Sequence, residues 1–211
     1  MKRNKLVNST IIVMTVVTAF FLQGCLGGTD LSRIERQRYE MRMEESGEVT
    51  AGYMLIETTP KADDQLEIKI DFKMGDSSFS QTMVTKTEEI GDAFGTLFFA
   101  NPTLMTLYGP LLASQAMFLP LLMTGGQMSE GFRWETSEAG ETLTYTVSSS
   151  ETRFGLKAYW VEIARNGQTV IRTLLAEEEM FPIVVEIRDP EMLEAGQTSL
   201  YYELTELILR D

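Results

Sequence analysis

The amino-acid sequence predicts an α+β fold dominated by β-strands, in which an antiparallel sheet carries short apolar helices on its dry face. Three observations lead to this class. Residues 66–74, LEIKIDFKM, alternate strictly between apolar and charged side chains, which is the pattern of a half-buried strand. Asn166 and Gly167 stand between two β-rich arms, and this dipeptide is the strongest short-range hairpin signal. Residues 93–129 carry no charge, and their composition is typical of helices.

The first element in the chain is an export signal. Three of the first five residues are basic, and residues 11–22 are apolar apart from Thr15 and Thr18. A basic start followed by a short apolar run is typical of a secretory signal. A membrane-spanning helix needs about 20 apolar residues, and the polar residues 8–10 shorten this run.

Residues 22–25, LQGC, end this run with the only cysteine of the chain. They resemble the lipobox of prokaryotic lipoproteins, because Leu22 lies three places before the cysteine and the small residue Gly24 lies immediately before it. The resemblance implies that residues 1–24 are a cleaved signal peptide and that a diacylglyceryl group is attached to the Cys25 sulfur. Two acyl chains hold a protein stably on a membrane, whereas one chain gives only marginal binding.

Two other interpretations of this segment stay open, namely an ordinary cleaved signal with an incidental cysteine and an uncleaved signal anchor. All three interpretations place residues 30–211 outside the cytoplasm. If Cys25 carries the lipid, residues 25–34 form a tether to the cell membrane or outer membrane, and residues 35–211 form a single β-rich domain. One cysteine permits no disulfide framework, so packing must stabilise that domain.

The sequence is acidic, with a formal net charge of −13. A surface of that sign repels nucleic acid and anionic lipid head groups, so neither is an expected partner. The chain contains no histidine, which removes the commonest general base, the Ser-His-Asp and Cys-His arrangements and nearly every catalytic zinc site. The sequence also lacks a G-x-S-x-G motif, a P-loop and a dinucleotide fingerprint. It therefore predicts no enzyme, no catalytic residue, no metal site and no cofactor.

A glycosidase that works with two carboxylates stays formally open, because that reaction needs no histidine. The candidates are the acidic pairs Glu44-Glu45, Asp63-Asp64 and Glu88-Glu89 and the acidic run at residues 177–179. They lie at turn-like positions or strand ends, where solvated surface charge is the simpler explanation.

The strands are expected to follow one another with short connections. Alternation or a turn signal favours strands at residues 39–43, 49–56, 66–74, 79–85, 132–135, 143–147, in the hairpin 158–175, and at 181–187 and 200–209. Asp189-Pro190 and Ala195-Gly196 mark turns before the last strand. Eight to ten strands of this kind predict a largely antiparallel meander.

The apolar segment 93–129 interrupts this pattern. Pro102, Pro110 and Pro120 divide it into two or three short helices, because each proline disfavours helix in the preceding residue and removes a hydrogen-bond donor. The uninterrupted pieces are too short for a transmembrane span and no basic cluster flanks them. Packing on the dry face of the sheet is the preferred expectation, and that role requires no ligand.

An exported, lipobox-bearing chain with an antiparallel sheet and an apolar helical insertion resembles the LolA-like lipoprotein-carrier superfamily. The resemblance covers residues 35–211 as an order of elements. It implies a strongly curved, half-barrel sheet whose concave face is covered by the insertion 93–129, and a cavity between sheet and helices that binds acyl chains or other apolar molecules. The resemblance includes no diagnostic motif, so no residue of the family is carried over.

Two functions are therefore expected. The first is a carrier or sensor of an apolar small molecule, lipid or acyl chain, in a cavity lined by Ile68, Ile70, Phe72, Phe98, Leu104, Met105, Met117, Phe118 and Leu122. Methionine suits such a cavity because its flexible side chain adapts to ligands of varied shape. The second is an interaction module with a solid core that holds an envelope protein near the membrane. Trp134 and Trp160 are core residues in the simpler interpretation and line the mouth of a cavity in the other.

Overall fold

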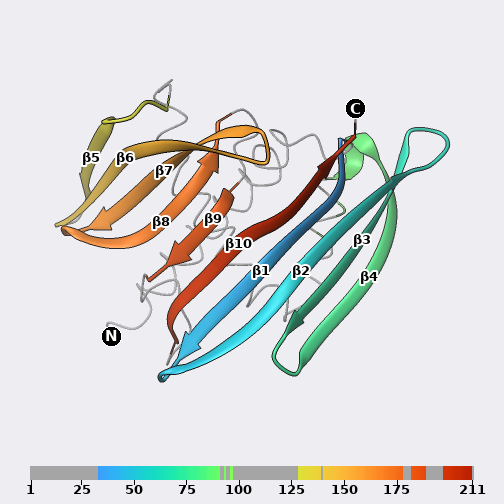
Figure 1. The fold of residues 1–211 in the computed structure, drawn as a ribbon, viewed down its shortest axis with the longest axis horizontal. Helices are drawn as coiled ribbons and strands as arrows, with labels where there is room; N and C mark the ends of the chain where they lie inside the picture. The colour runs from blue at the N-terminus through green and yellow to red at the C-terminus, as the bar shows by residue number, and fades with distance from the viewer. Residues whose placement is uncertain are drawn as a thin grey trace, which may run out of the picture.

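The computed structural model describes residues 33–90, 93, 96, 128–138, 140–177, 182–188 and 197–210. These residues form one ten-stranded sheet with the order β4-β3-β2-β1-β10-β9-β8-β7-β6-β5, shown in Figure 1. All neighbouring strands are antiparallel. The strands are β1 Ile34–Glu45, β2 Glu48–Pro60, β3 Gln65–Met74, β4 Ser77–Lys86, β5 Arg133–Glu138, β6 Glu141–Arg153, β7 Leu156–Arg165, β8 Gln168–Ala176, β9 Pro182–Ile187 and β10 Gln197–Leu209.

The predicted hairpin at Asn166-Gly167 is confirmed as the turn between β7 and β8. Both residues have positive φ, 51° and 82°, and Arg165 lies opposite Gln168 across the turn. A two-residue turn with two positive φ angles matches the twist of the flanking strands, and asparagine and glycine adopt that backbone at the lowest cost. The local sequence favours this turn, and Thr142 of the neighbouring strand adds two contacts: its N–H donates to Asn166 Oδ1 at 2.9 Å, and its carbonyl accepts from the Asn166 N–H at 2.8 Å.

The expected meander is interrupted once, where the first strand pairs with the last. Two consecutive runs, β1 to β4 and β5 to β10, each follow the order of the chain, and β1 joins them by pairing with β10. Tyr39 lies opposite Leu204, and Met41 lies opposite Tyr202. This contact between distant parts of the sequence turns two smaller sheets into one.

The predicted α+β class is wrong. The described residues are almost entirely strand, and the bounded elements are the ten strands and one short 3-10 turn, Thr87–Glu89. Ile90, Ala93 and Thr96 are the only other described residues in helical conformation, and no described helix covers a concave face of the sheet. Most of the expected insertion 93–129 lies outside the described residues. Alternation identified the strands correctly, whereas apolar composition alone did not specify a helical layer.

The pairing register gives the sheet one continuous apolar face. Residues directly opposite each other in antiparallel strands point to the same side, as do residues two apart along one strand. The positions aligned in this way from β4 to β10 are Phe79, Phe72, Met54, Tyr39 and Leu204. From β10 to β5 the alignment continues through Tyr202, Val185, Thr173, Val161, Val147, Tyr145 and Trp134. None of these aligned positions carries a charge. We call this side the apolar face and the opposite side the charged face.

The end of the β6–β7 hairpin covers part of the charged face. Arg153, at the end of β6, reaches Glu203 of β10 with 4.0 Å between Nη1 and Oε1, although three strands separate β6 from β10 in the sheet. Leu174 and Val184, which lie opposite each other on that side, are 0% and 5% exposed. The middle of the sheet is therefore dry on both sides, which explains the nearly continuous apolar sequence of β9.

Candidate functional site

The candidate site is the apolar face, and three of the predicted lining residues lie on it. Ile68, Ile70 and Phe72 are 0%, 2% and 3% exposed and alternate along β3 as the sequence predicts. The other predicted lining residues fall outside the described part of the chain, and they are Phe98, Leu104, Met105, Met117, Phe118 and Leu122. β3 therefore contributes three of the predicted lining residues to the apolar face.

The first, second and last strands contribute residues that the sequence reasoning did not propose for the site. Met54 of β2 lies opposite Phe72, and Met41 of β1 lies opposite Tyr202 of β10. These residues are at most 3% exposed. Their strands were predicted, but their position beside β3 depends on the pairing of β1 with β2 and β10. The only local signal was the alternation that marks each strand as apolar on one side.

Three buried polar side chains on the apolar face, Gln37, Tyr39 and Thr173, are hydrogen-bonded within the protein. The Tyr39 hydroxyl donates to the Pro182 carbonyl at 2.8 Å and accepts from Nε2 of Gln37 at 2.9 Å. Thr173 donates to the Val184 carbonyl at 2.7 Å. Buried polar groups normally find such partners, because an unsatisfied group is costly. A ligand on this face would therefore be recognised mainly through apolar contact and shape.

Solvent reaches the apolar face at its two ends. On β4, Phe79 and Met83 are partly buried and pack against the apolar core. On β5, Trp134 is partly buried, and its ring centroid lies 4.9 Å from that of Tyr145. Burial raises the pKa of the Tyr145 hydroxyl, so that group stays neutral. These two ends are the parts of the face that a ligand can first contact.

The two tryptophans therefore have different roles. Trp134 lies on the apolar face, whereas Trp160 lies opposite Leu174 on the other side of the sheet. The Trp160 indole Nε1 donates to Oε2 of Glu151 at 3.3 Å, and the Arg172 guanidinium lies 4.4 Å from the ring centroid. Trp160 is partly buried and packs against the apolar core on that side, while its polar edge and one ring face contact charged residues. Of the two, only Trp134 can border the candidate site.

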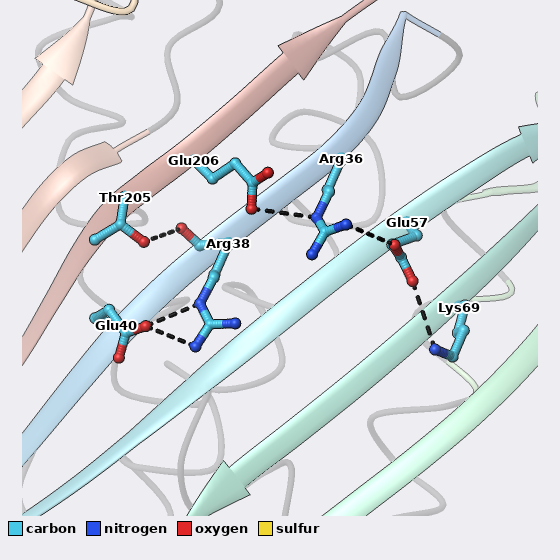
Figure 2. A network of polar contacts seen from close by, with 7 residues as sticks. All are labelled: Arg36, Arg38, Glu40, Glu57, Lys69, Thr205 and Glu206. Carbon is cyan, nitrogen blue, oxygen red and sulfur yellow. Dashed lines mark hydrogen bonds and ion pairs between the residues drawn. The ribbon is translucent and has the colours of Figure 1, made fainter.

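A ladder of charges crosses the opposite face from β10 to β3, as Figure 2 shows. Arg36 of β1 stands between Glu206, 3.2 Å from its Nε, and Glu57, 3.4 Å from its Nη1. The Nε contact pairs charges without hydrogen-bond geometry. Lys69 continues the ladder, with its Nζ 3.5 Å from Glu57 and 2.6 Å from Asp71. Exposed pairs of this kind add little stability, so the ladder chiefly keeps this face wet and leaves the other face to apolar contacts.

Protonation of the Asp71 carboxylate is expected to lower the free energy of unfolding slightly in acid. The hydrogen bond from Lys69, followed by that from Ser80, holds the pKa of Asp71 below its ordinary value. The lowered pKa stabilises the fold above the unfolded pKa of about 4, and this stabilisation is lost as pH falls through the lower folded pKa. Urea unfolding between pH 6 and 2 should show the wild type losing its advantage over Asp71→Asn only below about pH 4. The matched control is Asp63→Asn, at an exposed turn position. A difference between the wild type and Asp71→Asn that persists at pH 2 would contradict the prediction.

Acidic residues form no metal site in the part of the chain that the structure describes. No three His, Cys, Asp or Glu side chains among those residues come together in an arrangement that could hold a metal ion. Asp63 and Asp64 lie in the turn between β2 and β3, with φ angles of 59° and 56°.

Within the same described residues, no helix has the length and apolar character needed to cross a membrane.

Comparisons with known proteins give only low structural similarity. The sequence matches no protein-family model and none of the curated proteins. One similar solved structure is the MucA/MucB complex of Pseudomonas aeruginosa, at 10% identity and a TM-score of 0.39, covering 90% of this chain and 57% of that chain. This chain thus spans about half the length of the MucB chains it matches.

Two further structures cover most of both chains. A β-barrel-like DUF1849 protein from Brucella abortus matches at 11% identity and a TM-score of 0.35, over 85% of this chain and 98% of that one. A structure described as an outer membrane lipoprotein-sorting protein domain, from Vibrio parahaemolyticus, matches at 8% identity and a TM-score of 0.26, over 92% and 93%. At this similarity neither the family nor the activity of these proteins transfers to the present chain.

Proposed function

We propose that this chain is a lipid-anchored extracytoplasmic protein that binds or senses an apolar ligand, such as an acyl chain, against the apolar face of its sheet. The observation that carries the proposal is the uncharged face that the register aligns across all ten strands. The proposal contains no catalytic step, because a chain without histidine lacks the commonest general base and the commonest metal ligand.

The membrane location rests on the N-terminal sequence. Its basic start, apolar run and LQGC tetrapeptide, ending in Cys25, support export followed by lipid attachment. A diacylated cysteine keeps the domain at a membrane surface. There, lipids and other apolar molecules are the ligands present at the highest local concentration.

The chemistry of the apolar face fits an acyl chain better than a polar ligand. Each methylene moved from water to an apolar surface contributes about 0.8 kcal/mol, and the buried Gln37, Tyr39 and Thr173 side chains on this face are already bonded internally. Met41, Met54 and Met74 are 1–4% exposed on it. Their flexible side chains can fit chains of different length and unsaturation.

The alternative is a solid-core interaction module, and the burial of the face favours it. Ile68, Val161 and Tyr202 are all 0% exposed, as expected of positions that already have apolar neighbours. In that case the apolar face is an ordinary core that contributes stability only. The two functions differ in one observable, which is whether a lipid occupies this face in the native protein.

Photoaffinity labelling with a diazirine-bearing hexadecanoic acid tests the proposal in membranes that contain the full chain. Cross-links should map to apolar-face residues of β3 and β4, because the apolar side chains of β3 all lie on that side. Met83→Asp should lower labelling about tenfold. The matched control is Val84→Asp, since Val84 is the next residue, is 53% exposed and lies on the opposite side of β4.

Thermal unfolding by circular dichroism checks that both variants remain folded. Labelling confined to the charged face, or equal loss in the two variants, would overturn the carrier function. An unlabelled wild-type protein would do the same and would leave the interaction module.

A further inference from the structure

We propose that β4 is a pairing edge for a second copy of this chain, with two β4 strands aligned antiparallel about a twofold axis at Gln81. This inference is independent of the ligand proposed above. It rests on the composition of β4, the direction of its backbone groups and the charges at its two ends.

The two edge strands of the sheet, β4 and β5, differ in how well their sequences prevent pairing with another strand. Residues 77–85 of β4, SSFSQTMVT, contain neither a charge nor a proline. β5 at the other edge is six residues long, against ten in β4, and carries Arg133, Glu135 and Glu138. Short strands and charged side chains are the usual means of preventing edge association. β4 uses neither of them along its central residues.

The turn geometry determines which backbone groups of β4 point outward. Gly75 and Asp76 form a two-residue turn that places Met74 opposite Ser77, and such a closing pair exchanges both of its hydrogen bonds. Because backbone direction alternates along a strand, the N–H and C=O groups of the odd-numbered residues of β4 point toward β3. The Thr87 amide, which donates to the Asp64 carbonyl at 3.1 Å, fits that alternation. The outward N–H and C=O groups are those of Ser78, Ser80, Thr82 and Val84.

The side chains of β4 are exposed along the same edge. Ser78, Ser80, Gln81 and Thr82 are exposed, and Val84 is 53% exposed. β4 thus has nine consecutive uncharged residues, 77–85, and its outward backbone groups have no neighbouring strand among the described residues. Such a strand is a template for another strand.

Charge complementarity favours a second copy of this chain as the partner that pairs with β4. Asp76 and Lys86 flank the uncharged residues of β4. With Gln81 opposite Gln81 of the second copy, Asp76 of each chain faces Lys86 of the other. The same register places the outward groups of Ser80 opposite those of Thr82 of the second copy, which is the arrangement that antiparallel hydrogen bonding requires.

This register also continues the apolar face from one copy to the other. Phe79 comes opposite Met83 of the second copy, on the side where these residues already pack against the core. Both side chains are partly exposed in the single chain. Their burial favours pairing, as apolar cross-strand pairs do within a sheet.

Disulfide trapping tests the register. Gln81 lies on the twofold axis in a pair without hydrogen bonds, where the two Cα atoms are about 4.5 Å apart, within the range that a disulfide bridges. Gln81→Cys in the full chain, oxidised in native membranes, should give a covalent dimer whose linked peptides join position 81 of both copies. Ser137→Cys, at an exposed position of β5, is the matched control and should give none.

A charge exchange tests the pairing without any cross-link. Asp76→Lys and Lys86→Asp should each raise the dimer dissociation constant about tenfold, because each replaces two attractive contacts with two repulsive ones. The double exchange should restore the wild-type value. Sedimentation of the detergent-solubilised full chain measures all four proteins. A monomer at every concentration, no rescue by the double exchange, or a link from position 81 to a different polypeptide would overturn the proposal.

Discussion

The Cys25→Ser chain is expected to leave the membrane fraction completely, whereas the wild-type chain stays there through alkaline carbonate washing. The sole cysteine ends a signal-like apolar run, and two acyl chains supply an anchor that a hydroxyl cannot carry. Mass spectrometry of the wild-type N-terminal peptide should find a mature chain that begins at Cys25 with a diacylglyceryl mass on its sulfur. This is the largest effect that any single substitution should have on location.

The two other interpretations of the N-terminus predict different results. A variant that remains in the washed membrane would indicate an uncleaved signal anchor, and a wild-type chain found in the soluble fraction would indicate an ordinary cleaved signal. Gly27→Ala, two residues after the cysteine, is the matched control. It should leave both membrane retention and the modified peptide unchanged, because it alters neither Leu22, Gly24 nor Cys25.

Local pattern was enough to place the strands. The alternation at residues 66–74 falls within β3, and each of its five apolar residues is buried. The Asn166-Gly167 dipeptide lies in the turn between β7 and β8. Both signals arise from neighbouring residues only: the alternation reflects the two-residue period of side chains in a strand, and the turn reflects the backbone angles that asparagine and glycine allow.

The helical layer was the part of the fold that composition predicted wrongly. Residues 93–129 are apolar and uncharged, but short apolar runs do not distinguish a helix from other buried structure. The bounded elements among the described residues are the ten strands and one 3-10 turn, and most of residues 93–129 lies outside the described residues. Apolar composition therefore did not determine the fold class, which follows from the strands.

The candidate site was predictable only in part, because it is assembled by non-local pairing. Ile68 and Phe72 followed from alternation, but Tyr202 joins them only because β10 pairs with β1, more than 150 residues away along the chain. A periodic pattern shows which side of a strand is apolar and gives no information on which strands are neighbours. The sequence pattern therefore could not predict that the apolar face continues from strand to strand.

Gly52→Ala is expected to destabilise the fold by about 3 kcal/mol, or to lower Tm by about 10 °C. Gly52 lies within β2, opposite Met74, and a Cβ added there would be 2.1 Å from the Lys73 carbonyl oxygen and 2.8 Å from the Met74 Cα. Both atoms belong to the backbone of β3, so no rotamer change relieves the contact. A glycine inside a strand often marks such a close approach.

The sign of this effect separates the contact from backbone propensity. Propensity alone predicts that alanine stabilises a strand interior by about 0.5–1 kcal/mol relative to glycine, whereas the close approach predicts a large loss. Gly47→Ala is the matched control, because Gly47 has φ +84° and no neighbour within 4 Å of an added Cβ. Its cost of about 1 kcal/mol should come from backbone strain. Urea unfolding of the three proteins decides the matter: a Gly52→Ala chain as stable as the wild type would show that β2 and β3 separate freely at this point.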